Sequence, residues 1–190
     1  MNSAQLTVKP GAVALMALMA ATRFHHFGSP FALPDASLAV FFLAGLWLGG
    51  RYLFALLLAE AGLIDYLAIA QLGVSDYCIS AAYLFLVPTY AAMWWGGKWC
   101  RRFAAVNFNT LAQQAVALVS ATSLAYLISN GSFYWLSGKF AGGNWTGFLE
   151  SFAKYYPSYL QYTAIYAVTV FALVVLGKNV LGQRATQHTH

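Results

Sequence analysis

Charged side chains are scarce in this chain of 190 residues. They make up 8% of it, with five Asp or Glu and ten Lys or Arg, whereas hydrophobic residues make up 61%. A soluble domain averages roughly 25% charged residues, and a soluble fold of this length has no room to hide so much apolar surface. A surface that faces lipid removes the problem, because lipid is as apolar as the side chains. The composition therefore excludes an ordinary soluble domain and predicts an integral membrane protein.

Several sequence patterns are also missing. No GxxxxGK pattern occurs, so the chain carries no phosphate-binding loop of the kind that hydrolyses ATP. The net charge is +5, but no basic run interleaves with aromatic residues on a polar surface, so we expect no nucleic-acid partner and attribute the charge to membrane topology and anionic headgroups. The apolar segments hold no paired histidines for a membrane haem. The two cysteines, Cys78 and Cys100, are expected on opposite sides of the membrane, which argues against a disulfide.

Apolar segments separated by short polar or Gly/Pro stretches predict six helices. We expect these helices over residues 10–23, 35–49, 51–70, 75–96, 110–128 and 157–176. The first two are short against the ~20 residues that span a bilayer. Because no linker or soluble domain interrupts the pattern, the predicted fold is all-α, a single domain built as a bundle of six transmembrane helices.

The positions of the ten Lys and Arg residues predict an orientation. If the N-terminus is cytoplasmic, seven of them lie in inner segments and three, Arg23, Lys139 and Lys154, in outer segments. An excess of Lys and Arg marks the cytoplasmic side, and the basic cluster within 98–102 sets most of this bias. We therefore expect both termini to be cytoplasmic in a multi-pass protein of the inner (cytoplasmic) membrane.

This topology gathers the reactive side chains at the outer face. His26 follows the first helix, and Asp65 lies near the outer end of the third. Cys78 is at the outer start of the fourth helix, with Tyr83 deeper in the same helix. The longest predicted loop, over 129–156, is outside as well and is rich in aromatic residues. The outer face therefore offers an imidazole, a carboxylate, a thiol and aromatic rings at one mouth.

Cys78 is a candidate metal ligand or nucleophile. Ser75 or Asp76 can cap the predicted fourth helix, which would place the thiol in its first turn. A helix N-terminus lowers the pKa of a thiol and favours the thiolate, which is a soft ligand for a transition metal. The alternative is a small hydrophobic side chain packed between helices.

His26 and Asp65 leave alternatives open as well. A histidine at position 26 can bind a metal, hydrogen-bond a ligand or lie among lipid headgroups, and one His with one Cys is too few for a closed zinc site, which takes four ligands. Asp65 lies inside an apolar helix, where an ionisable group is costly and indicates function. It can instead form a salt bridge or a hydrogen bond between helices.

Small residues recur four positions apart in the first two predicted helices. Ala17 and Ala21 form one such pair, and Gly45 and Gly49 form the other. This spacing lets a second helix approach closely. The approaching helix can belong to a partner subunit or to this bundle.

Six short helices, basic inner loops and the absence of an ATPase motif resemble the substrate-binding S-components of energy-coupling-factor (ECF) transporters. The details are similar to the solitary cobalamin-specific members of that family. These details are Phe-His-His-Phe-Gly at 24–28, Pro-Asp-Ala-Ser-Leu-Ala at 34–39, Asp65, and Ser-Asp-Tyr-Cys at 75–78 with Tyr83. The resemblance covers essentially the whole chain.

The resemblance implies a role for each candidate residue. Cys78 would be an axial ligand to the cobalt of cobalamin, which would bind with its own nucleotide base off the metal. His26, Asp65 and Tyr83 would line the outward pocket. An electron-rich thiolate labilises or reduces the group opposite it, so Cys78 would also allow removal of cyanide from cyanocobalamin.

The resemblance also implies partners. Ala17 and Ala21 match the small-residue motif by which S-components dock on a transmembrane coupling subunit, which works with ATPases. The expected partners are therefore cobalamin, membrane lipid and an ECF-type coupling complex. Three alternatives remain: an S-component for another small vitamin, a structural membrane subunit, or a membrane enzyme. In that enzyme Cys78, His26 and Asp65 would be nucleophile, base and orienting group.

Overall fold

Helices make up nearly all of the computed structural model, which describes residues 9–24, 33–103, 107–140 and 142–187, with side-chain surroundings described as far as Lys178. No strand occurs in these ranges. The elements are α1 (Pro10–Arg23), α2 (Ser37–Trp47), α3 (Arg51–Leu72), the 3₁₀ helix η1 (Ala81–Phe85), α4 (Leu86–Cys100), α5 (Phe108–Leu136) and α6 (Trp145–Gln187). The predicted all-α fold class is confirmed for the described residues.

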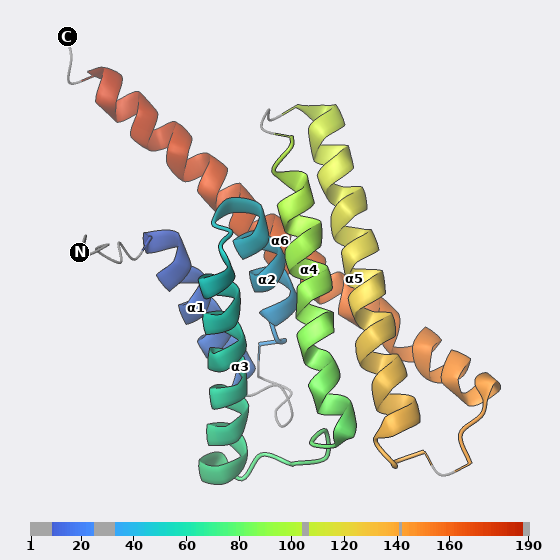
Figure 1. Ribbon diagram of the computed structural model, residues 1–190. Coiled ribbons are helices and arrows are strands. Elements are labelled where there is room, and N and C mark those ends of the chain that lie inside the picture. The colour runs from blue at the N-terminus through green and yellow to red at the C-terminus, as the bar shows by residue number, and fades with distance from the viewer. Residues whose placement is uncertain (1–8, 25–32, 104–106, 141, 188–190) are drawn as a thin grey trace, which may run out of the picture.

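The helices alternate in direction (Figure 1). α1 packs against α2 and α3, α2 packs against α4, and α5 lies between α4 and α6. The end of α1, the connection from α3 to η1 and the connection from α5 to α6 therefore lie at the same end of the bundle, here called the cavity end. The sequence predicted this grouping of connections. Which side of the membrane the cavity end faces stays a prediction.

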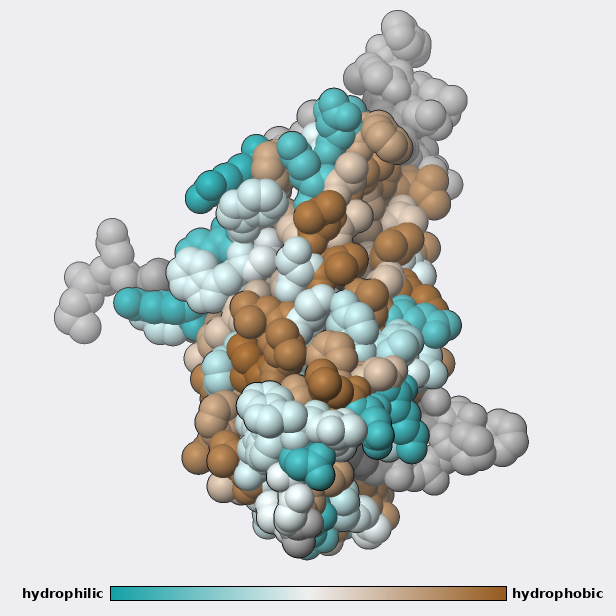
Figure 2. All heavy atoms as spheres, turned by 90° about the vertical axis from the view of Figure 1, so that its right-hand side faces the viewer, coloured by the Kyte–Doolittle hydropathy of each residue, from teal (hydrophilic) through white to brown (hydrophobic). Residues whose placement is uncertain are grey.

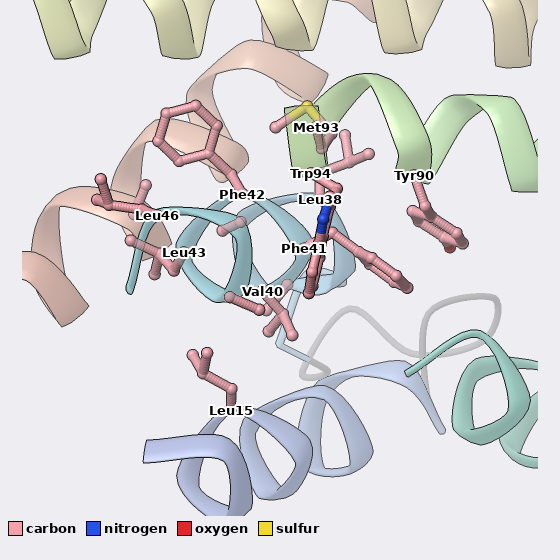
Figure 3. Packing of buried hydrophobic residues seen from close by; sticks show 14 of the residues in the cluster. Leu15, Leu38, Val40, Phe41, Phe42, Leu43, Leu46, Tyr90, Met93 and Trp94 are labelled. Carbon is pink, nitrogen blue, oxygen red and sulfur yellow. The ribbon is translucent and has the colours of Figure 1, made fainter. Parts of the chain in front are cut away.

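α2 forms the centre of the bundle. Ten of its eleven residues are buried, as expected for a helix that is hydrophobic on all sides. Within this core the ring of Phe41 stacks on that of Tyr90, with centroids 4.2 Å apart and planes 7° apart, and Figure 3 shows both beside Met93 and Trp94 of α4. A central helix that is short and fully covered does not need the length of a membrane span.

Two glycines allow α2 and α4 to touch along their backbones. A Cβ on Gly45 would collide with the carbonyl oxygen of Trp94, and a Cβ on Gly97 would collide with that of Phe42. Gly45 therefore mediates packing within this bundle, which was one of the two alternatives for its small-residue pair. Gly49 has a different role, because it lies beyond α2 with a positive φ of 62°.

Within the part of the chain that the structure describes, three helices are by length and composition able to cross a membrane: Arg51–Leu72, Phe108–Leu136 and Trp145–Lys178. On the face around α5 and α6, hydrophobic side chains cover much of the middle and hydrophilic ones gather toward the ends (Figure 2). Exposed apolar side chains such as Val116, Val168 and Leu173 belong to this surface. The structure thus supports a helical membrane protein, whereas six complete spans stay a prediction.

The predicted start of the fourth helix was wrong. α4 begins at Leu86 and not at Ser75, and the residues before it form turns and η1. The hydroxyl of Ser75 accepts a hydrogen bond from the Tyr77 amide, and that of Ser80 accepts one from Ala82, so these serines stabilise local turns. Pro88 explains the late start, because proline is tolerated in the first turn of a helix and disrupts its interior.

The predicted loop over 129–156 was also wrong. α5 continues to Leu136, and α6 begins at Trp145. The polar stretch within 129–132 stays helical, and Pro157 lies inside α6 rather than at its start. Both helices are longer than predicted because tertiary contacts outweigh the local helix-breaking signals.

Candidate functional site

A cavity of about 460 Å³ opens at the cavity end of the bundle. Its wall takes side chains from all six α-helices and η1, and from the segments that lead into α2 and η1. Asp65, Cys78 and Tyr83 all line it. Its volume lies within the range of roughly 300–1,000 Å³ that is usual for small-molecule sites. The fold therefore brings three of the predicted site residues to one cavity.

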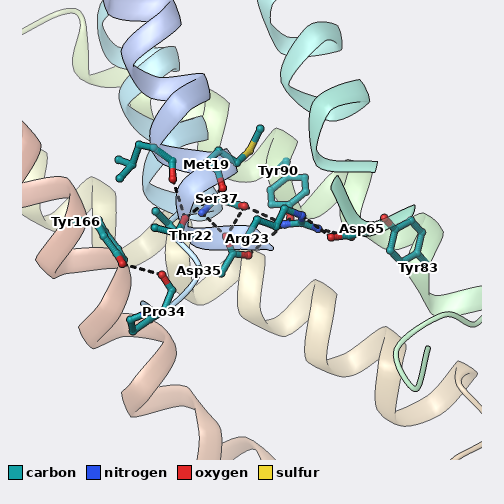
Figure 4. A network of polar contacts seen from close by, with 12 residues as sticks. Met19, Thr22, Arg23, Pro34, Asp35, Ser37, Asp65, Tyr83, Tyr90 and Tyr166 are labelled. Atoms are coloured by element: carbon teal, nitrogen blue, oxygen red, sulfur yellow. Dashed lines mark hydrogen bonds and ion pairs between the residues drawn. The ribbon is translucent and has the colours of Figure 1, made fainter. Parts of the chain in front are cut away.

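Arg23, the last residue of α1, organises the polar side of the cavity. Its side chain is only 3% exposed. Nε and Nη2 donate to the two carboxylate oxygens of Asp65 at 2.7 and 2.6 Å, a bidentate pair (Figure 4). Such forked arginine–carboxylate bonds are among the strong hydrogen bonds of proteins because both partners are charged.

The other guanidinium nitrogen reaches the segment that leads into α2. Nη1 of Arg23 donates to Asp35 at 3.1 Å, to Ser37 at 2.9 Å and to the hydroxyl of Tyr90 at 2.7 Å. The Ser37 hydroxyl in turn donates to Asp35 at 2.6 Å. One arginine thus joins the end of α1 to α2, α3 and α4 through charged hydrogen bonds.

Two further hydrogen bonds hold the segment before α2 against its neighbours. The amide of Ala36 donates to the hydroxyl of Thr22 in α1 at 3.1 Å, and the hydroxyl of Tyr166 in α6 donates to the carbonyl of Pro34 at 2.8 Å. The cavity wall is therefore fixed by helices from both sides of the bundle.

Asp65 forms the salt bridge that was one of its two alternatives, whereas its functional role stays a prediction. It forms a buried salt bridge with Arg23, and it also lines the cavity. The hydroxyl of Tyr83, on η1, donates to its Oδ2 atom at 2.7 Å. Asp65 therefore links the buried arginine to a tyrosine at the cavity wall.

Cys78 lies in a turn and not in the first turn of a helix, so the predicted lowering of its pKa by a helix N-terminus was wrong. Its half-buried side chain lines the cavity. Burial raises the pKa of the thiol, and the negative charge of Asp65 raises it further, whereas Lys139 lowers it. The thiol is therefore protonated at neutral pH in the ligand-free protein.

Among the remaining predicted residues, His26 lies outside the described residues. Ala17 and Ala21 are both exposed on α1, on the side away from the buried Met19. A surface of small residues that faces outward is compatible with close approach of another helix.

The ranges that the structure describes contain no group of three or more His, Cys, Asp or Glu side chains that could hold a metal ion. Cys78 is the only described thiol that lines the cavity, because Cys100 is buried in the core. A single thiolate can bind a metal ion whose other coordination positions are already occupied by ligands that it carries with it.

Sequence reasoning missed Arg23 and Asp35 as site residues. Arg23 was interpreted only as one of three outer cations, although an arginine that is buried rather than at the interface needs nearby carboxylates. In the sequence, Asp35 and Asp65 lie near the same predicted outer end of the bundle as Arg23. The presence of carboxylates near this cation was therefore the available signal. Tyr90 and Ser37 carried no signal, because only tertiary packing brings them to the guanidinium.

No protein-family model matches this chain, and no curated protein matches it significantly in sequence.

Proposed function

We propose that this chain is a membrane-embedded substrate-binding subunit for cobalamin uptake, which binds cobalamin at the outer face with Cys78 as an axial cobalt ligand. One observation carries the proposal: Asp65, Cys78 and Tyr83, which resemble residues of the cobalamin-specific S-components, line a single cavity, with Asp65 on α3, Cys78 in the turn that follows and Tyr83 on η1.

The donor set fits the cobalt of a corrin. A corrin fills the equatorial positions of its metal, so the protein needs to supply one axial donor, and Cys78 is a soft thiol at the cavity wall. The half-buried thiol loses its proton as the cobalt–sulfur bond forms. Because its pKa is raised, this bond is expected to become more favourable as the pH rises toward that pKa.

The cavity is smaller than a complete cobalamin. At about 460 Å³, it would hold one part of the corrin, and the remainder would lie beyond the cavity mouth. This volume favours a second candidate, an S-component for a smaller vitamin, which would fit inside entirely. The two candidates differ in one observable, because only cobalamin presents a metal to the thiol.

Uptake needs partners in the membrane. Ala17 and Ala21 would form the face that docks on an ECF-type transmembrane coupling subunit, and associated ATPases would supply the energy. Removal of cyanide from cyanocobalamin is a secondary activity of the same site in this proposal. A Cys78→Ala protein that removes cyanide at the parent rate would rule it out.

The decisive experiment is a visible absorption spectrum of the detergent-purified protein mixed with cyanocobalamin. We expect a shifted corrin spectrum with the parent protein and with Cys100→Ala, whose thiol is buried in the core. The shift should be absent with Cys78→Ala. If the parent protein retains no corrin, cobalamin is not the ligand and the smaller-vitamin candidate remains.

A further inference from the structure

The polar atoms of the cavity wall are unequal in what they offer a ligand. Arg23 is the only cation among the described lining residues. Its Nε, Nη1 and Nη2 atoms all donate to protein acceptors, on Asp65, Asp35, Ser37 and Tyr90. A guanidinium held in this way neutralises carboxylates of the protein rather than those of a ligand.

Tyr83 is likewise committed as a donor. Its hydroxyl proton is directed at the Oδ2 atom of Asp65, 2.7 Å away. A hydrogen bond to an ionised acceptor is roughly twice as strong as a neutral one, so a neutral ligand acceptor does not displace it. Arg23 also donates to the Tyr83 oxygen, which leaves this oxygen one lone pair to accept a hydrogen bond from a ligand, and the side chain lines the cavity.

The summed charge of the lining side chains also disfavours a carboxylate on the ligand. The described lining residues include two carboxylates, Asp35 and Asp65, against the single guanidinium of Arg23, so their formal sum is −1. Lys139 lowers the pKa of Cys78, but it lies outside the lining, with its ammonium 4.7 Å from the ring centre of Tyr77. A carboxylate on a ligand would meet like charge here and no uncommitted cation.

We propose that this cavity selects N–H groups such as primary carboxamides over carboxylates, with Tyr83 as the specificity-determining hydrogen-bond acceptor. This inference rests on the proposed function, because the edge of cobalamin is rich in primary amides. The amide N–H would then distinguish the accepted ligand from an analogue with a carboxylate at the same position.

The test compares cyanocobalamin with two sets of derivatives, each altered at one peripheral amide. In the first set the amide is hydrolysed to a carboxylate, and in the second it is converted to an N,N-dimethylamide, which is neutral but has no N–H. Affinities are measured for the parent protein, for Tyr83→Phe and for the matched control Tyr162→Phe. Tyr162 also lines the cavity, and no hydrogen bond of its hydroxyl is described.

For the amide that contacts Tyr83, we expect both derivatives to bind the parent protein at least about tenfold more weakly than cyanocobalamin. In Tyr83→Phe the gap between amide and dimethylamide should close, while the carboxylate stays disfavoured because Asp35 and Asp65 are still present. Tyr162→Phe should keep both gaps.

Three outcomes would overturn the inference. If every derivative binds the parent within about twofold of cyanocobalamin, the wall does not select N–H groups. If the gap between amide and dimethylamide survives in Tyr83→Phe, another residue provides the selection. If the parent binds no cyanocobalamin at all, both the proposed function and this inference fail, which separates that result from the other two.

Discussion

Burying an arginine costs free energy unless its charge is compensated. The contribution of Arg23 to the free energy of unfolding therefore depends on its carboxylate partners. Taking a charged group out of water costs several kcal/mol, which close and well-aligned counter-charges offset. Arg23 is 3% exposed and has Asp65 at 2.6 Å and Asp35 at 3.1 Å. Asp65 provides two of the hydrogen bonds and should be the more important partner.

Replacing Asp65 with asparagine should therefore destabilise the protein strongly. The substitution keeps the shape but leaves Arg23 with one carboxylate, and breaking a buried ion pair from one side costs about 3–5 kcal/mol. Since Asp35 remains, we expect about 3 kcal/mol, measured as a loss of unfolding free energy in detergent. The matched control is Asp76→Asn, an exposed aspartate near the same end, and equal stability of the two variants would contradict the prediction.

The Cys78 thiol should react slowly with alkylating reagents at neutral pH. Only the thiolate reacts, and burial together with Asp65 raises the thiol pKa, so a smaller fraction is ionised at a given pH. In a Cys100→Ala background, the alkylation rate should rise with pH to a midpoint above the ordinary thiol value of about 8.5. A midpoint at or below that value would be inconsistent with the described surroundings.

Lys139 provides an internal check on the cause of this shift. Its ammonium lowers the pKa of Cys78, so Lys139→Met should move the alkylation midpoint to still higher pH. Lys154→Met is the matched control, because Lys154 likewise lies over a tyrosine, 5.0 Å from the ring centre of Tyr155. It should leave the midpoint unchanged.

At the scale of helices, the contact between α2 and α4 depends on a missing side chain. A methyl group at Gly97 has no space, because it would meet the backbone of α2. We expect Gly97→Ala to lower the unfolding free energy by about 1–3 kcal/mol, the usual cost of overpacking. Gly62→Ala in α3 is the control, since a Cβ there meets nothing within 4 Å. It should be neutral or stabilising, because alanine favours a helix.

The accuracy of the sequence predictions followed the strength of the local signals. α3 was predicted to within two residues, since it ends at Gly73, which has a left-handed φ of 66° that few other residues adopt. The starts of the fourth and sixth helices were misplaced, because Pro88 lies in the first turn of α4 whereas Pro157 lies inside α6. Sequence alone does not distinguish these contexts without knowing what packs on the helix.

The site was predictable where a residue type is chemically unusual for its surroundings. Cys78 and Asp65 were found because a thiol and a membrane carboxylate are rare. The partners of Arg23 were not, since Ser37 and Tyr90 are common residues that become polar contacts only when α2 and α4 meet. Membership of a hydrogen-bond network is a tertiary property and leaves little trace in local sequence.

At the scale of the whole molecule, the alternation of the helices constrains the topology in the membrane. Lys139 lies on the α5–α6 connection at the cavity end, and Arg102 follows α4 at the opposite end; both side chains are exposed. If the bundle spans the bilayer, the two positions lie on opposite sides. The excess of Lys and Arg at the Arg102 end predicts that this end faces the cytoplasm.

Cysteine labelling tests this arrangement in intact cells. Lys139→Cys and Arg102→Cys are each placed in a protein in which Cys78 and Cys100 are replaced by alanine. A membrane-impermeant maleimide added outside should label Lys139→Cys, whereas Arg102→Cys should react only after the cells are lysed. Labelling of both from outside would mean that the bundle does not span the membrane as proposed. Labelling of Arg102→Cys alone would invert the orientation, placing the cavity on the cytoplasmic side, where it could not collect a ligand for uptake.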